Sequence, residues 1–199
     1  VRSRRQRQMC IRDRAYAENI NVFDFTEEEL STLKVRKVRG ADAKTKYTLG
    51  NNENGKYIKA VANNSASGLG KELKINLKKT PFLNITWKVE KDLTGIVENS
   101  KKGHDYAARV FVVKKTGATP LSNRAMNYVF SSNNDINTHH PSPFTKKSID
   151  YVLSTTKEDL NEWVTVKVNV RDHFKKFHDL DLDDINGCLL YTSPSPRDG

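Results

Sequence analysis

Two charged residues near the middle of the chain, Asp105 and Arg109, have the types and spacing to recognise a polar ligand. They lie four positions apart in an apolar stretch, so on a β-strand both side chains project from one face, and Tyr106 is expected on the other. A guanidinium among apolar residues has to be paired, because an unpaired buried charge is costly. Two interpretations stay open. One is an Arg–Asp pair that fixes the strand register; the other is a guanidinium that binds a carboxylate or a sugar hydroxyl.

Three further side chains suit ligands rich in hydroxyl groups. Asn127 and Tyr128 are neighbours on a predicted strand, where an amide bonds hydroxyls and a phenol ring stacks on a sugar face. The alternative for both is ordinary packing with satisfied polar groups. Trp163 lies opposite a stripe of valines, so we expect it either under a loop or exposed as a platform for a sugar ring. Trp87 lies on the apolar face of its strand and is expected in the core.

No metal or cofactor motif is recognisable. His139 and His140 are adjacent, and neighbouring residues on an extended chain point to opposite sides, which is poor spacing for one ion. The acidic run that begins at Asp179 has Asp184 at its sixth position, where a calcium-binding EF-hand loop has glycine. Residues 15–187 contain no nucleophile elbow, zinc-protease motif, P-loop or dinucleotide-binding glycine motif. We expect no metal and no cofactor.

The two ends of the chain can be encoded by one DNA sequence read in both directions. Residues 9–14 fit ATGTGTATAAGAGACAG, and the segment after Gly187 fits its reverse complement, CTGTCTCTTATACACAT. Both ends look like a transposase adapter used in short-read sequencing. We therefore expect residues 1–14 and 188–199 to be adapter and residues 15–187 to be one incomplete domain. The alternative is a basic arm and a Ser/Pro-rich tail. Residues 1–14 should make few contacts, and residues 188–192, if they form a strand, should stand in for a native one.

Composition excludes several classes of protein. The chain of 199 residues is 36% hydrophobic and 29% charged, which is typical of a globular domain. No apolar run approaches the roughly 18 residues needed to cross a bilayer, so no membrane span is expected. Without the two ends, 34 basic and 24 acidic residues fall to 27 and 22, and the net charge falls from +10 to +5. The dense arginine cluster disappears, so nucleic-acid binding is not expected. Both cysteines disappear as well, which removes any disulfide.

The elements that must position these residues are predicted to be mostly short strands. Period-two alternation predicts strands at residues 57–62, 68–77, 82–89, 105–113, 125–131, 148–155 and 162–170. Residues 171–178 are predicted to form a short helix, Thr26 and Glu29 make a capping-box pattern, and residues 50–55 have loop chemistry. Short strands with Gly-, Asn- and Pro-rich connections favour an all-β fold. We expect an antiparallel β-sandwich with one short helix, truncated at its C-terminal strand.

Six ordered blocks carry a resemblance to a known family. They are residues 65–69, 80–83 with Trp87, 105–112, 127–130, 141–145 and 162–164. In these blocks the stretch 57–187 resembles the bacterial family called domain of unknown function 3047. Phe130 stands where the family tends to have Trp, and Ser142 where Asn is usual. The resemblance implies a jelly-roll sandwich similar to galactose-binding and other sugar-binding modules, exported to the periplasm or outside the cell. It supplies no activity.

The leading hypothesis is a non-catalytic exported β-sandwich that binds a carbohydrate or a similar polar ligand. Its candidate ligand-binding residues are Asp105, Arg109, Asn127, Tyr128 and Trp163. Two alternatives stay open: a hydrolase or lyase acting on a polysaccharide, and a structural or interaction domain of the cell envelope. No spacing supports a carboxylate pair for glycoside hydrolysis, so no catalytic residue is assigned. The sequence leaves the oligomeric state open.

Overall fold

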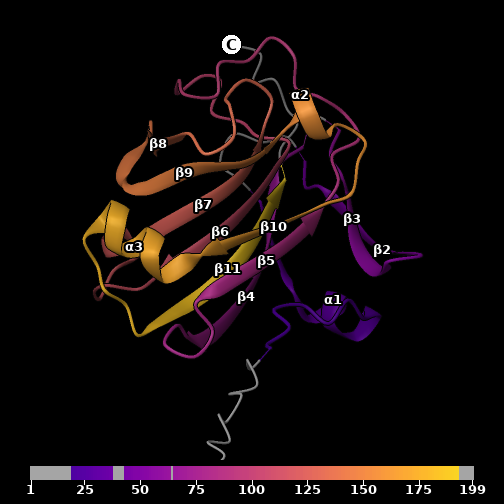
Figure 1. Cartoon of the computed structure of the whole chain (residues 1–199). Helices are drawn as coiled ribbons and strands as arrows, with labels where there is room; N and C mark the ends of the chain where they lie inside the picture. The colour runs from indigo at the N-terminus through magenta and orange to yellow at the C-terminus, as the bar shows by residue number, and fades with distance from the viewer. Residues whose placement is uncertain (1–18, 38–42, 64, 193–199) are drawn as a thin grey trace, which may run out of the picture.

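The computed structural model describes residues 19–37, 43–63 and 65–192, and its main feature is a seven-stranded sheet (Figure 1). The strand order in this large sheet is β1-β4-β11-β6-β7-β9-β8. Its strands are β1 (Lys34–Lys37), β4 (Ser67–Asn76), β6 (Ala108–Lys114), β7 (Arg124–Ser131), β8 (His139–Ser142), β9 (Thr145–Thr155) and β11 (Asp184–Thr192). Two small sheets accompany it. They pair β5 (Phe82–Trp87) with β10 (Val164–Asn169), and β2 (Lys46–Asn52) with β3 (Gly55–Val61).

The β5–β10 sheet and helix α3 (Val170–His178) lie against one face of the large sheet, here called the inner face (Figure 1). Alternation along each strand sends every second side chain to this face, where the main core forms. The core contains Trp87, Val110, Tyr128, Phe130 and Phe174, each buried. This arrangement confirms the predicted all-β sandwich and the expected core position of Trp87.

One pair of neighbouring strands in the large sheet, β7 and β9, is parallel, whereas the other pairs are antiparallel. The chain leaves β7, forms the edge strand β8, and returns as β9 between β8 and β7. This route makes β9 antiparallel to β8 and parallel to β7. The large sheet is therefore mixed, where the sequence predicted an antiparallel one.

All seven predicted strands are present, and the differences are shifted strand ends and several short elements that the sequence did not predict. The strand expected from residue 105 begins at Ala108, so Asp105 precedes β6. The loop expected at residues 50–55 is shorter, because β2 continues through Asn52 and only Glu53 and Asn54 form the turn. Gly55 follows this turn with a φ of +112°, a value that favours glycine. Strands β1, β2 and β8 and helix α2 (Thr156–Asp159) were not predicted.

Both helices indicated by the sequence form. In α1 (Glu27–Thr32) the Thr26 hydroxyl accepts a hydrogen bond from the Glu29 amide at 3.1 Å, as the capping-box pattern predicts. Helix α3 begins one residue earlier than expected and is capped by the Asn169 side chain. Phe174 on its inward side is fully buried, so α3 closes one end of the sandwich.

Residues 188–192, expected to stand in for a native strand, form the second half of β11. This strand lies in the middle of the large sheet and pairs with β4 on one side and β6 on the other. The segment 1–14, expected to make few contacts, lies outside the described residues. Among the residues that the structure describes, no helix is long and apolar enough to span a membrane.

Candidate functional site

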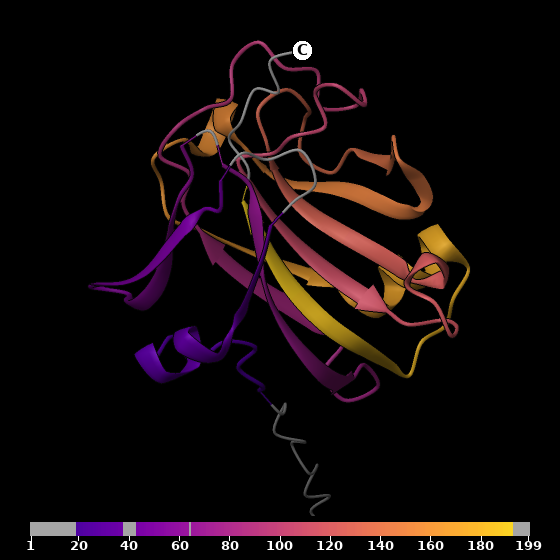
Figure 2. The same ribbon diagram turned by 180° about the vertical axis from the view of Figure 1, so that it is seen from behind.

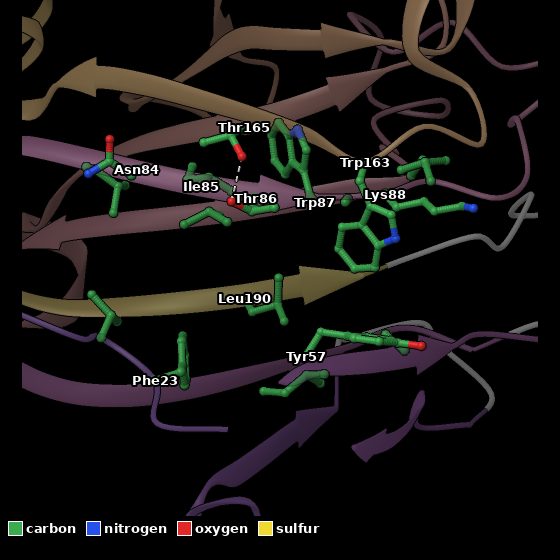
Figure 3. A pocket seen from close by; sticks show the side chains of 18 of the residues that line it. Phe23, Tyr57, Asn84, Ile85, Thr86, Trp87, Lys88, Trp163, Thr165 and Leu190 are labelled. Carbon is green, nitrogen blue, oxygen red and sulfur yellow. Dashed lines mark hydrogen bonds between the residues drawn. The ribbon is translucent and has the colours of Figure 1, made fainter. Parts of the chain in front are cut away.

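An open cleft of about 1600 Å³ lies between the inner face of the large sheet, strand β5, strand β3 and residues 19–25. Val110 and Leu190 from the large sheet line its floor. Strands β3 and β5 belong to different sheets and do not pair, so the space between them stays open. Figure 3 shows this cleft with Tyr57 on β3 facing the β5–β10 sheet.

An aromatic pair, Trp163 and Tyr57, lines the cleft. Their ring centroids are 5.1 Å apart and their planes meet at 66°, so the two rings form a corner (Figure 3). Trp163 immediately precedes β10 and, as its spacing predicted, lies opposite the inward valines. Both residues are half-buried. A corner of two rings offers apolar surface of the kind on which sugar rings stack.

Gly50 sets the position of Tyr57. The two residues are cross-strand partners in the β2–β3 hairpin. A Cβ at position 50 would lie 2.4 Å from Cζ of the Tyr57 ring, so the ring packs directly over the glycine backbone. Absence of a side chain at position 50 therefore lets the Tyr57 ring lie flat on its own hairpin and reach Trp163.

Polar side chains from β5 and β10 stand beside the aromatic pair. Asn84, Thr86 and Thr165 are exposed and line the cleft, and the two threonine hydroxyls are 2.8 Å apart (Figure 3). Lys88 follows β5 and is half-buried next to Trp163. An amide, hydroxyls and an ammonium next to aromatic surface can bond the hydroxyl groups of a sugar while its ring stacks.

Three carboxylates line the cleft, and their contacts differ. Glu90 forms an ion pair of 3.7 Å with Lys59. Asp92 accepts hydrogen bonds from the Thr156 hydroxyl at 2.8 Å and the Leu93 amide at 2.9 Å. Burial alone would raise the pKa of Asp92, but hydrogen bonds from Ser132, Thr156 and the Leu93 amide hold it below its usual value. Asp105 is half-buried and accepts from the Tyr106 amide at 3.1 Å.

Two of the five candidate ligand-binding residues, Asp105 and Trp163, line this cleft. The other three, Arg109, Asn127 and Tyr128, do not. Arg109 and Asn127 are buried on the outer face of the large sheet, and Tyr128 is fully buried on the inner face. Asn127 and Tyr128 are neighbours on β7, and strand alternation therefore separates their side chains by the thickness of the sheet.

Arg109 is packed between aromatic rings on the outer face. Its guanidinium carbon lies 4.6 Å from the centroid of the Tyr106 ring and 5.4 Å from that of Phe111. The expectation that Tyr106 lies on the opposite face was wrong, because β6 begins only at Ala108 and the preceding loop turns Tyr106 back over the outer face. There Tyr106 packs with Val129 and Val152, and burial raises the pKa of its hydroxyl.

Residues 88–107, the connection from β5 to β6, are fixed to the large sheet by four buried polar residues: Glu98, His104, Asn127 and Asp150. This group is called the clamp. His104 Nε2 lies 2.6 Å from Asp150 Oδ2, with the carboxylate as acceptor. The Asn127 amide nitrogen donates to Asp150 Oδ1 and to the Ser148 hydroxyl, both at 2.7 Å. Figures 1 and 2 show this connection arching over one end of the sheet.

Glu98 completes the clamp at the end of β7. Its carboxylate is 1% exposed and accepts hydrogen bonds from the Ser132 amide at 2.6 Å and the Asn134 side-chain amide at 2.7 Å. The Ser131 hydroxyl and the Asn133 amide also donate to it. A buried carboxylate that accepts four donors stabilises the fold only as long as each donor is present.

Tyr128 belongs to an aromatic cluster beneath α3. Its hydroxyl lies 3.3 Å from Nδ1 of His173, and Tyr151 and Phe177 pack around the same histidine. Burial lowers the pKa of His173, and the nearby Lys176 lowers it further. This cluster packs α3 against β7 and β9, and the members named here do not line the cleft.

Three aspartates of the acidic run after α3 form ion pairs. Asp181 pairs with Arg171 at 2.7 Å, Asp183 with Lys78 at 2.8 Å, and Asp184 with Lys114 at 2.6 Å. The Lys114 hydrogen bond holds the pKa of Asp184 below its usual value. Among the described residues, no group of three or more His, Cys, Asp or Glu side chains is placed to hold a metal ion.

Sequence reasoning missed most of the cleft. The outward positions Asn84, Thr86 and Lys88 were visible as the polar side of an alternating strand, which was a usable signal. Tyr57 had no such signal, because its partner Trp163 is 106 positions away. The clamp had none either, since Glu98 and His104 lie in a connection without regular structure.

A comparison with known families supports the predicted resemblance. A family model described as "Protein of unknown function (DUF3047)" matches residues 31–194, which is most of the chain. The match covers the clamp, β11 and the cleft lining except for residues 19–25. No curated protein matches the chain.

Proposed function

This chain belongs to the family of proteins of unknown function DUF3047, and from the geometry of its cleft we propose that it binds a carbohydrate there without catalysing a reaction. The observation that carries the proposal is the corner formed by Trp163 and Tyr57 beside the exposed Asn84, Thr86 and Thr165. Aromatic surface binds the apolar face of a sugar, and the amide and hydroxyls bond its edge. Asp105 is the carboxylate acceptor for sugar hydroxyls in this proposal.

The size and shape of the cleft support an oligosaccharide as ligand. A volume of about 1600 Å³ exceeds that of an ordinary small-molecule pocket, which is about 300–1,000 Å³. The cleft is open to solvent, so a chain of sugars can extend beyond it. The family resemblance supports a place of action in the bacterial periplasm or outside the cell.

Binding is favoured over the alternative of a polysaccharide hydrolase or lyase. A glycosidase needs two carboxyl groups facing the scissile bond, one of them with a raised pKa so that it donates a proton. In this cleft Glu90 pairs with Lys59, and hydrogen bonds hold the pKa of Asp92 below its usual value. A lowered pKa keeps Asp92 ionised, so Asp92 is not suited to donate a proton as a general acid.

The test is calorimetric titration of the full chain with a panel of neutral and acidic oligosaccharides, comparing the wild type with Trp163→Ala. Loss of an aromatic stacking platform should weaken binding about tenfold or more. Phe144→Ala is the matched control, because Phe144 is also an exposed aromatic residue, at 56%, and does not line the cleft. This control should bind as the wild type does.

Two results contradict the proposal. One is wild-type affinity of the Trp163→Ala variant for the oligosaccharide, with a thermal midpoint that shows the variant to be folded. The other is the absence of binding to every oligosaccharide in the panel, which favours the third alternative, a structural or interaction domain of the cell envelope.

A further inference from the structure

The mouth of the cleft carries three hydrogen-bond donors that point the same way. In Figure 3 the indole nitrogen of Trp163, the ammonium of Lys88 and the hydroxyl of Tyr57 are all directed to one end of the cleft. They come from three different elements: the start of β10, the end of β5, and β3. Tertiary structure therefore gathers them at one place, and that place is suited to an acceptor-rich group.

The lining of the cleft carries one more lysine than it has carboxylates. Four lysines line the cleft, Lys56, Lys59, Lys88 and Lys91, against three carboxylates. Lys59 already pairs with Glu90, and Asp92 is held by hydroxyl and amide donors. Within the part of the chain that the structure describes, no ion pair joins Lys88 to a carboxylate. An ammonium beside aromatic surface and without an ion pair favours an anionic ligand, because the ligand then supplies the opposite charge.

We propose that the ligand is an acidic glycan whose uronic-acid carboxylate binds Lys88 at the mouth of the cleft, an assignment that rests on the proposed function. The sugar ring that bears the carboxylate stacks in the corner of Trp163 and Tyr57. Lys88 provides the charge, while the indole nitrogen and the phenol hydroxyl donate to the remaining carboxylate and hydroxyl oxygens. The next sugar extends along Thr86 and Thr165, whose hydroxyls lie on the same wall.

The experiment compares uronic-acid oligosaccharides with their methyl esters, which keep the sugar backbone and remove the charge. The acidic forms should bind about tenfold more tightly than the esters at low salt, and this difference should shrink as salt increases. Lys88→Gln should bring the acidic form close to the affinity of the ester and should weaken binding of the ester much less. Lys167→Gln is the matched control: Lys167 lies on the same small sheet, over the Phe82 ring at 4.4 Å, and does not line the cleft.

The outcomes separate this inference from the proposed function. Equal binding of acid and ester overturns the acidic-glycan assignment and leaves carbohydrate binding in place. Equal loss of acid and ester binding in Lys88→Gln also overturns it, because Lys88 would then be structural. Competition by poly-glutamate as strong as by the acidic glycan would replace the sugar with an acidic peptide. Failure of every oligosaccharide to bind overturns both proposals together.

Discussion

The cleft and the clamp are both rich in polar side chains, but these side chains differ in what they contact. In the clamp, Glu98 and Asp150 are 1% exposed and each accepts hydrogen bonds from several protein donors. In the cleft, Asn84 and Thr86 are exposed and stand beside aromatic rings. Polar groups that are already bonded inside the protein stabilise the fold, whereas exposed ones next to aromatic surface remain available for a ligand.

The difference explains where the candidate residues lie. Arg109 and Asn127 were predicted to bind a ligand because a guanidinium can bind a carboxylate or a sugar hydroxyl and an amide can bond sugar hydroxyls. The structure places both in buried surroundings, with Arg109 between aromatic rings and Asn127 bonded to Asp150. Trp163, which the sequence placed either under a loop or exposed as a platform, lies in the cleft. Burial of a polar group therefore indicates a role in the scaffold more often than a role in binding.

The largest effect should come from breaking the clamp. Glu98→Ala leaves the buried donors of Ser131 and Ser132 and the half-buried amide of Asn134 without their acceptor, and we expect it to lower the free energy of unfolding by about 3–5 kcal/mol. Glu90→Ala is the control, because the Glu90 side chain is 64% exposed and its removal should change stability by less than about 0.5 kcal/mol. Urea unfolding of both variants measures the difference. If the two variants were equally stable, the clamp would not be a stabilising element.

A smaller effect, on binding rather than on stability, should follow from Gly50→Ala. The added Cβ would lie 2.4 Å from the Tyr57 ring, so the ring has to move away from Trp163. We expect glycan affinity to fall about fivefold, or roughly 1 kcal/mol, measured by calorimetry. Tyr57→Phe keeps the ring over Gly50 and removes only the hydroxyl donor, so its affinity should fall less than that of Gly50→Ala. Unchanged binding by Gly50→Ala would show that the aromatic corner is not needed.

The smallest effect is a change of stability with pH. It comes from the aromatic cluster under α3, which belongs neither to the cleft nor to the clamp. Burial lowers the pKa of His173 below its ordinary 6.5, so the folded protein favours the neutral imidazole. The unfolded chain takes up the proton first on acidification, and stability should therefore be complete above about pH 6.5 and decrease below it. His178, whose pKa burial also lowers, contributes in the same direction.

Urea unfolding at several pH values between 7.5 and 5 measures this decrease. His173→Gln should show a flatter profile over that range, while its affinity for glycans stays that of the wild type. A profile as steep as that of the wild type would mean that other groups cause the acid sensitivity.

Much of the fold could be predicted from the sequence, and the reasons are local. The valines of β10 and the apolar positions of β5 alternate with polar residues, so both strands and their inward faces follow from period two. The capping-box pattern of Thr26 and Glu29 predicted α1, because capping acts within one turn. Strands β1, β2 and β8 lacked such a pattern: β2 is interrupted by Gly50, and β8 contains Pro141.

The sequence by itself determined that this is a β-rich sandwich with a helix predicted at residues 171–178, which residues of β5 and β10 face inward, and the family to which the chain belongs. Only the tertiary structure decided which polar residues share a site. Tyr57, Lys88 and Trp163 meet through contacts between separate strands, as do His104 and Asp150. Periodicity within a strand fixes the face of a side chain, but the packing of distant segments decides whether that face meets a ligand or the protein itself.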